Sequence, residues 1–183
     1  MSLTTLDAKT ALIVIDMQKG ITSLPTVHPI QEVTNNVSKL TSAFRQHTRP
    51  VILVNVTGGA PGRTESARRN NTSRPDDWAE LIPELNKQPG DITVTKQRWG
   101  AFHETSLSKH LQGLGITQVV LAGVSTSVGV ESTARSAYEH GYHVTLATDA
   151  MTDMSLEAHA NSVQRIFPKL GETGTAQEVI DLL

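Results

Sequence analysis

The sequence contains no cysteine. Disulfide bonds, thiolate metal sites and cysteine nucleophiles are therefore excluded. Aromatic residues are scarce at 4%, whereas hydrophobic residues reach 38%, so aliphatic side chains must supply most of the core. A length of 183 residues suits one domain with a sizeable core and is short for two. We therefore predict a single domain spanning residues 1–183.

Long apolar runs and an excess of one charge are also absent. No run approaches the roughly 18 apolar residues that a membrane span requires. Met1–Thr10 lacks the basic and apolar regions of a secretory signal, so we expect a cytoplasmic protein. A net charge of −2 provides no field to attract nucleic acid or an anionic membrane. The densest basic cluster is interpreted as a solvated surface loop and comprises Arg63, Arg68, Arg69 and Arg74.

Apolar runs of strand length alternate with amphipathic helical segments along the chain. Runs without polar alternation are typical of strands covered on both faces. This order predicts an α/β fold of three layers, α/β/α, around a parallel sheet. The predicted strands are Ala11–Ile15, Val51–Val56, Asp91–Thr95, Gln118–Ala122 and His143–Thr148. The predicted helices are Ile30–His47, Leu107–Leu114, Thr126–His140, one capped by Ser155 and one capped by Thr175.

Polar residues follow the predicted strands at the edge where open parallel sheets bind ligands. Asp16 follows the first strand, Lys96 follows the third and Asp149 lies beyond the fifth. A carboxylate and an ammonium at neighbouring strand ends can share one cleft and perturb each other's pKa. From this pattern alone, a simple salt bridge or two independent polar residues remains the alternative.

The turn Gly123–Gly129 leads from a predicted strand into a helix. Backbone N–H groups in such a turn can bind oxyanions or carboxylates, although any turn of this kind favours small residues. The turn nearly matches the nucleophile elbow G-x-S-x-G but has Ser127 in place of the last glycine. A serine acyl hydrolase using Ser125 or Ser127 is therefore one alternative. Histidine spacing typical of metal sites and nucleotide-binding glycine loops are absent, so we expect no metal and no cofactor.

Three segments together resemble the isochorismatase-like hydrolase superfamily, which also contains nicotinamidases and N-carbamoyl amidases. Ala11–Gln18 is similar to its apolar strand followed by D-x-Q, and Lys96–Phe102 to its lysine and aromatic loop. Gly123–Tyr138 is similar to its strand-to-helix turn G-V-x-T-x-x-C-V-x-x-T-A-x-x-A. The likeness extends from about Thr10 to Phe167 with matching order and spacing.

The resemblance implies a six-stranded parallel, Rossmann-like sheet and a cis peptide bond between Val124 and Ser125. It implies a small-molecule substrate and a homodimer or homotetramer. It places Asp16, Lys96 and position 129 at the catalytic centre. The substrate-binding residues that it implies are Gln18, Trp99, Phe102, Val124, Ser125, Thr126 and Val128.

Gly129 stands where most of these relatives carry the nucleophilic cysteine. Glycine has no side chain, so thioacyl chemistry is impossible there. Glycine at this position resembles true isochorismatases, which cleave a vinyl ether by protonation and attack of water. The resemblance thus implies hydrolysis of a small carboxylate or ether-type substrate, with Asp16 as general acid/base, Lys96 as its partner, and room at Gly129 for substrate or water. A non-catalytic binding protein remains a further alternative.

The resemblance also bears on metals. Nicotinamidases carry an Asp-x-His metal site after the second strand, whereas this chain has Asn55-Val56-Thr57. We therefore expect no zinc in that loop.

Overall fold

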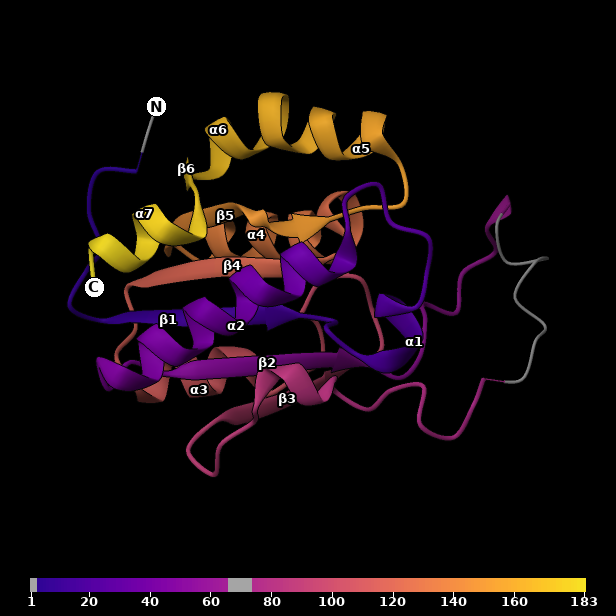
Figure 1. Cartoon of the computed structure of the whole chain (residues 1–183), viewed down its shortest axis with the longest axis horizontal. Helices are drawn as coiled ribbons and strands as arrows, with labels where there is room; N and C mark the ends of the chain where they lie inside the picture. The colour runs from indigo at the N-terminus through magenta and orange to yellow at the C-terminus, as the bar shows by residue number, and fades with distance from the viewer. Residues whose placement is uncertain (1–2, 66–73) are drawn as a thin grey trace.

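The computed structural model describes residues 3–65 and 74–183, and its centre is a sheet of six parallel strands (Figure 1). The strand order is β3-β2-β1-β4-β5-β6. This sheet confirms the predicted α/β fold class. The strands are β1 (Thr10–Ile15), β2 (Val51–Val56), β3 (Ile92–Lys96), β4 (Gln118–Val124), β5 (His143–Thr152) and β6 (Glu172–Gly174).

Helices cover both faces of the sheet, as a parallel sheet requires. The α2 and α7 helices pack on one face, and α3, α4 and α6 pack on the other (Figure 1). The longer helices are α2 (Ile30–Gln46), α3 (Leu107–Gly113), α4 (Glu131–Glu139), α5 (Leu156–Asn161) and α7 (Ala176–Asp181). The shorter turns are α1 (Lys19–Thr22), η2 (Pro83–Leu85), η3 (Thr126–Val130), η4 (Ser162–Ile166) and α6 (Phe167–Leu170).

The strand β1 shows how the sequence specifies two cores. Its side chains alternate in direction, so Leu12 and Val14 join the cluster under α2, while Ile13 and Ile15 join the cluster under α3 and α4. All four are at most 1% exposed. Burial of both faces explains why the strand is a continuous apolar run.

The strand β5 is longer than the sequence pattern predicts. The prediction ended at Thr148, but β5 continues to Thr152 because its pairing with β4 shifts register between Leu121 and Gly123. Asp149 therefore lies inside the strand, and the prediction that it follows the strand end is wrong. Its carboxylate accepts hydrogen bonds from Ala176 N (2.6 Å) and Asn36 Nδ2 (3.3 Å), so it links β5 to neighbouring helices.

The chain reverses its direction of travel across the sheet between β1 and β4. From β1 it proceeds outward to β2 and β3, and from β4 it proceeds the other way to β5 and β6. Ligands of open α/β sheets bind at such a switch point, beyond the carboxyl ends of the strands. Asp16 follows β1 and Ser125 follows β4, so both residues flank this point.

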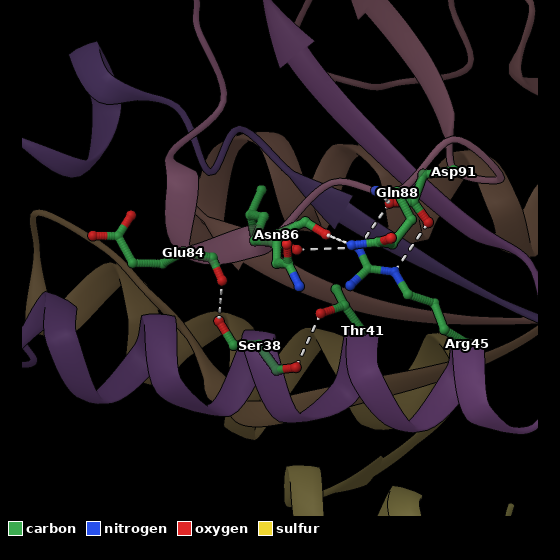
Figure 2. Close-up of polar contacts among 8 residues, drawn as sticks. Ser38, Thr41, Arg45, Glu84, Asn86, Gln88 and Asp91 are labelled. Carbon is green, nitrogen blue, oxygen red and sulfur yellow. Dashed lines mark hydrogen bonds and ion pairs between the residues drawn. The ribbon is translucent and has the colours of Figure 1, made fainter.

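The segment that leads into β3 is fastened to α2 by polar side chains (Figure 2). Arg45 donates to Asp91 Oδ1 from Nε (3.1 Å) and to Asp91 Oδ2 from Nη2 (2.7 Å). The same Nη2 donates to the Leu85 carbonyl, and Ser38 Oγ donates to the Glu84 carbonyl. Asp91 directly precedes β3, so this pair anchors the start of the strand that ends at Lys96.

An Asp91→Ala variant is expected to lose stability because it leaves the guanidinium of Arg45 without its partner. The Asp91 side chain is 3% exposed and that of Arg45 18%, so the pair is poorly screened by solvent. We expect a loss of about 3 kcal/mol in the free energy of unfolding, measured by urea denaturation. Glu84→Ala is the matched control, because its exposed side chain makes no hydrogen bond or ion pair with any residue that the structure describes. Equal midpoints for the two variants would contradict the prediction.

Candidate active site

Asp16 occupies a specific backbone conformation at the end of β1. Its φ is +50°, a left-handed conformation that aspartate tolerates better than bulkier residues. Its N–H donates to the Val54 carbonyl and its carbonyl accepts from Gln18 N, at 2.9 and 2.8 Å. These bonds fix the residue at the switch point, where it is only 5% exposed.

The carboxylate of Asp16 is paired with Lys96, although the strands that they follow, β1 and β3, are not neighbours, since β2 lies between them. Lys96 Nζ lies 2.7 Å from Asp16 Oδ2 and donates a second bond to the Arg98 carbonyl at 3.1 Å. Burial raises the pKa of the Asp16 carboxyl to about 6, because the charge and hydrogen bond of Lys96 offset the cost of desolvation only in part. Asp16 Oδ1 is buried and has no hydrogen-bond partner among the described residues.

The turn after β4 brings Gly129 to this pair. The Val124–Ser125 peptide bond is cis, and residues Thr126–Val130 form a wide π-helical turn, η3. A Cβ atom placed on Gly129 would lie 3.3 Å from Asp16 Oδ2. A side chain at position 129 would therefore face the carboxyl group, which is where the resemblance implies a cysteine.

The space beside Gly129 is not empty, contrary to the expectation of room for a substrate. The same Cβ position is 2.9 Å from Ile15 Cγ2, closer than real Cβ contacts allow. Ile15 is β-branched and fully buried, so its methyl group has little freedom to move. The Ile15 side chain therefore leaves no space for a Cβ atom at position 129.

A Gly129→Ala variant is expected to be less stable than the wild type. Overpacking against Ile15 costs about 1–3 kcal/mol, which exceeds the roughly 1 kcal/mol that alanine gains over glycine in a helix. Gly113→Ala is the control, because a Cβ there would meet nothing within 4 Å. Thermal unfolding should show a lower Tm for Gly129→Ala and an unchanged or higher Tm for Gly113→Ala. The opposite order of Tm values would show that the Ile15 side chain can move aside at little cost.

Several backbone N–H groups of the turn are already used within the protein. Ser127 N donates to Asp153 Oδ2 at 2.7 Å. Val128 N and Val130 N both donate to the Ser125 carbonyl, at 3.2 and 3.1 Å. Within the predicted turn Gly123–Gly129, the N–H groups of Ser127 and Val128 thus already have acceptors inside the protein.

Gln18 has no free polar atom for a substrate, so the prediction that it binds one is not supported by its surroundings. Its Oε1 accepts from Val56 N (2.7 Å), and its Nε2 donates to the carbonyls of Val56 and Trp78 (3.1 Å each). The side chain is fully buried. Gln18 instead ties the end of β2 and the segment around Trp78 to the residues that follow Asp16.

Three other predicted substrate-binding side chains also lie in the interior. Phe102 is 8% exposed and stacks on the His140 ring at 4.9 Å. The Val124 side chain belongs to the core cluster under α2, and Thr126 is fully buried with its hydroxyl 2.9 Å from His159 Nδ1. Direct substrate contact by these three side chains stays a prediction, although each packs against the protein's own residues in this structure. The Val124 carbonyl, however, lies 3.6 Å from the Cβ position of Gly129.

Trp99 and Val128 are at least partly exposed, whereas Ser125 is only 7% exposed, and substrate contact by these three residues stays a prediction. Trp99 is 64% exposed, so it does not pack within its own loop and is free to cover a ligand or meet another chain. Ser125 Oγ contacts Met154 Sδ at 3.5 Å, and Ser127 Oγ donates to Asp153 Oδ2 at 2.8 Å. Neither serine hydroxyl is within hydrogen-bond distance of a histidine in the described structure, so neither has the base that activates a serine nucleophile.

Sequence reasoning missed Asp153 and His159, which contact the turn directly. Asp153 was overlooked because β5 was predicted to end before it. His159 was one of seven histidines with no distinguishing spacing. The helix cap at Ser155 placed a strand-to-helix turn near Asp153, but no pattern singled out its carboxylate.

The loop after β2 shows no metal site in the part of the chain that is described. Asn55 Nδ2 donates to the Ala79 carbonyl, and Asn55 Oδ1 accepts from Thr95 Oγ1. Residues 3–65 and 74–183 contain no group of three or more histidine, aspartate or glutamate side chains placed to hold a metal ion. They also contain no helix long and apolar enough to cross a membrane. Arg68 and Arg69 of the predicted basic loop lie outside the described residues.

Comparison with known proteins identifies the class that this fold and site define. The Isochorismatase domain family matches residues 10–178, so the chain belongs to the isochorismatase family of hydrolases. It is 42% identical over 179 residues to the uncharacterized isochorismatase family protein YwoC of Bacillus subtilis, covering 94% of this chain and 93% of YwoC. It is 32% identical over 171 residues to the ureidoacrylate amidohydrolase RutB of Pseudomonas syringae pv. syringae, covering 78% of this chain and 70% of RutB.

A solved structure agrees with the sequence comparison. The structure of an isochorismatase family protein from Burkholderia thailandensis superposes with a TM-score of 0.87 at 39% identity, covering 100% of this chain and 99% of that one. The family and fold predicted from the three motifs are confirmed.

Proposed function

We propose that this chain hydrolyses a small carboxylate or ether-type substrate without a covalent protein intermediate, with Asp16 as general acid/base and Lys96 as its partner. The observation that carries the proposal is a buried carboxyl with a pKa of about 6, facing a position that has no side chain. A carboxyl with a pKa near neutrality can both donate and accept a proton during a reaction cycle.

The contacts of the carboxyl group indicate which oxygen carries the proton. Lys96 holds Oδ2, and an oxygen that accepts from an ammonium is a poor site for a proton. The proton therefore belongs on Oδ1, which has no other partner. The site is nearly closed to solvent, since Asp16 is 5% and Lys96 2% exposed, so the attraction between them is weakly screened.

For a vinyl ether, the proton that Asp16 donates is recovered from the attacking water. Asp16 Oδ1 gives its proton to the terminal carbon of the double bond, and the ether-bearing carbon becomes an oxocarbenium centre. Water adds to that carbon and returns a proton to Asp16, whose carboxylate Lys96 stabilises in the interval. The hemiketal then collapses to a ketone and an alcohol. Trp99, Ser125 and Val128 are the residues that we assign to substrate contact.

Amide hydrolysis is the competing function, because RutB is by name an amidohydrolase. The test is a parallel assay of purified protein: pyruvate release from isochorismate, and ammonia release from ureido, carbamoyl and pyridine carboxamide compounds. We expect turnover of a vinyl ether or another non-amide substrate. Turnover of amides alone would overturn the substrate class, and binding without any turnover would favour the non-catalytic alternative.

Covalent mechanisms are tested separately in single turnovers in ¹⁸O-labelled water. Attack by free water puts the label in the product and leaves the protein mass unchanged. Label in the Asp16 peptide would identify the carboxylate as a nucleophile instead. Labelling of Ser125 or Ser127 by a fluorophosphonate probe, with loss of activity, would favour the serine acyl hydrolase.

A further inference from the structure

Two side chains that follow β5 hold two adjacent residues of the turn that carries Gly129. His159 Nδ1, from α5, lies 2.9 Å from Thr126 Oγ1. Asp153 Oδ2 accepts from both the backbone N–H and the hydroxyl of Ser127, at 2.7 and 2.8 Å. The bond from His159 runs from α5 to η3, and the bonds to Asp153 run from the β5–α5 connection to η3, so together they form a two-point attachment of the turn.

Asp153 is fixed firmly enough to serve as an anchor. It is 4% exposed, and its second oxygen, Oδ1, accepts from Met154 N and Ser155 N at 2.7 and 3.3 Å. Its own carbonyl accepts from Val27 N at 2.9 Å. A buried carboxylate with both oxygens occupied by donors is held in one orientation.

His159 is braced from the other side by a second histidine. The rings of His28 and His159 meet edge to face with centroids 4.6 Å apart. His28 Nδ1 in turn lies 3.0 Å from Thr152 Oγ1, the last residue of β5. Burial lowers the pKa of His159, the neighbouring His28 lowers it further, and Asp153 opposes the shift. These shifts favour the neutral form of the ring that contacts Thr126.

The attachment acts on Asp16 through the turn. Gly129 is three residues beyond Thr126 within η3, and its missing side chain would meet Asp16 Oδ2 at 3.3 Å. Displacement of η3 would thus remove backbone from beside the carboxyl group and admit water to it. Hydration stabilises the ionised form of a carboxyl group.

We propose that Asp153 and His159 are positioning residues, which hold the η3 turn against Asp16 and thereby keep the acid desolvated. This inference rests on the proposed function only in taking Asp16 as the acid. Neither residue is proposed to touch the substrate.

The test follows the titration of the Asp16 carboxyl by ¹³C NMR, with Asp16→Asn to assign its signal. Three variants are compared with the wild type. His159→Leu removes the bond to Thr126, His159→Asn restores a polar group near the Nδ1 position, and Thr126→Val removes the same bond from the other partner. Glu157→Gln, an exposed change on the same helix, is the control.

His159→Leu and Thr126→Val are each expected to lower the pKa of Asp16 by about one unit. The double variant should add little to either, because both remove one interaction. His159→Asn and Glu157→Gln should stay near the wild-type value. An Asp153→Ala variant tests the second attachment point in the same way, and also covers the case in which His159→Leu fails to fold.

The two proposals fail in distinguishable ways. An unchanged Asp16 titration in folded His159→Leu, Thr126→Val and Asp153→Ala proteins would overturn the positioning role, whatever the enzyme's activity. A shifted titration supports the positioning role even if no tested substrate is turned over. Where turnover is found, the positioning role predicts a lower kcat with KM nearly unchanged, and recovery of kcat in His159→Asn.

Discussion

An Asp16→Asn variant is expected to lose turnover by about 10³-fold or more while keeping its fold. Asparagine has nearly the same shape and can still accept the hydrogen bond from Lys96, so the 2.7 Å contact has a neutral substitute. What it lacks is a proton that can be given and taken back. The measurement is kcat on the best substrate from the parallel assay, with circular dichroism to verify folding. Activity within a few-fold of wild type would remove Asp16 from the acid role.

The pH dependence of the wild type is part of the same prediction. A general acid works in its protonated form, and the pKa of Asp16 is raised to about 6. The rate should therefore fall as pH rises above 6, and the small residual rate of Asp16→Asn should not follow that limb. A wild-type rate that climbs through pH 6 would instead indicate that the carboxylate acts first as a base.

The pH dependence of the free energy of unfolding tests the raised pKa of Asp16 without a substrate. The pKa of Asp16 is about 6 in the folded protein and 3.8 in an unperturbed chain, so the folded state binds the proton more tightly. That contribution is fully present below pH 3.8 and is lost as pH rises through 6. A difference of roughly 2 units corresponds to roughly 3 kcal/mol. Urea unfolding at pH 4 and pH 7 should show this loss in the wild type, relative to Asp16→Asn.

The fold was predictable because a strand that is buried on both faces of the sheet requires a continuous apolar segment in the sequence. Ala11–Ile15 is apolar throughout and Val51–Val56 is apolar except for Asn55, and each is the strand that it was predicted to be, within one residue. The same pattern placed Asp16 and Lys96 at one edge of the sheet, because parallel strands bring their carboxyl ends together, but it left two independent polar residues as the alternative to their pairing. The short strand β6 (Glu172–Gly174) has no apolar run, and only the family resemblance implied it.

The errors have a common physical origin, which is contact between residues distant in the chain. The shift of register between β4 and β5 moves Asp149 into the strand and makes Asp153 the residue at its end. Gln18 and Thr126 are polar, so a motif assigns them to ligand, yet their partners are the backbone of Val56 and Trp78 and the ring of His159. No local pattern reports such partners, which come together only in the folded chain.

A Lys96→Met variant is expected to lose about 10²-fold in kcat and to move the descending, high-pH limb of the pH profile to higher pH. Lys96 lowers the pKa of Asp16 through its charge and its hydrogen bond, so removing it leaves desolvation unopposed and the pKa rises further above 6. More of the enzyme is then protonated at neutral pH, which alone would favour an acid. The loss of kcat is expected to outweigh this gain, because the Asp16 carboxylate that forms during the reaction then has no cation beside it.

The matched control for Lys96→Met is Lys19→Met. Lys19 also pairs with carboxylates, Asp77 and Glu80, but its side chain is 42% exposed and solvent screens the pairs. Its pH profile should coincide with that of the wild type. The two variants thus distinguish a general effect of removing a positive charge from the specific effect of removing the Lys96 ammonium. If the limb of Lys96→Met stays at its wild-type pH while Lys19→Met is unaffected, the ammonium does not set the acidity of Asp16, and Lys96 serves only to bind substrate.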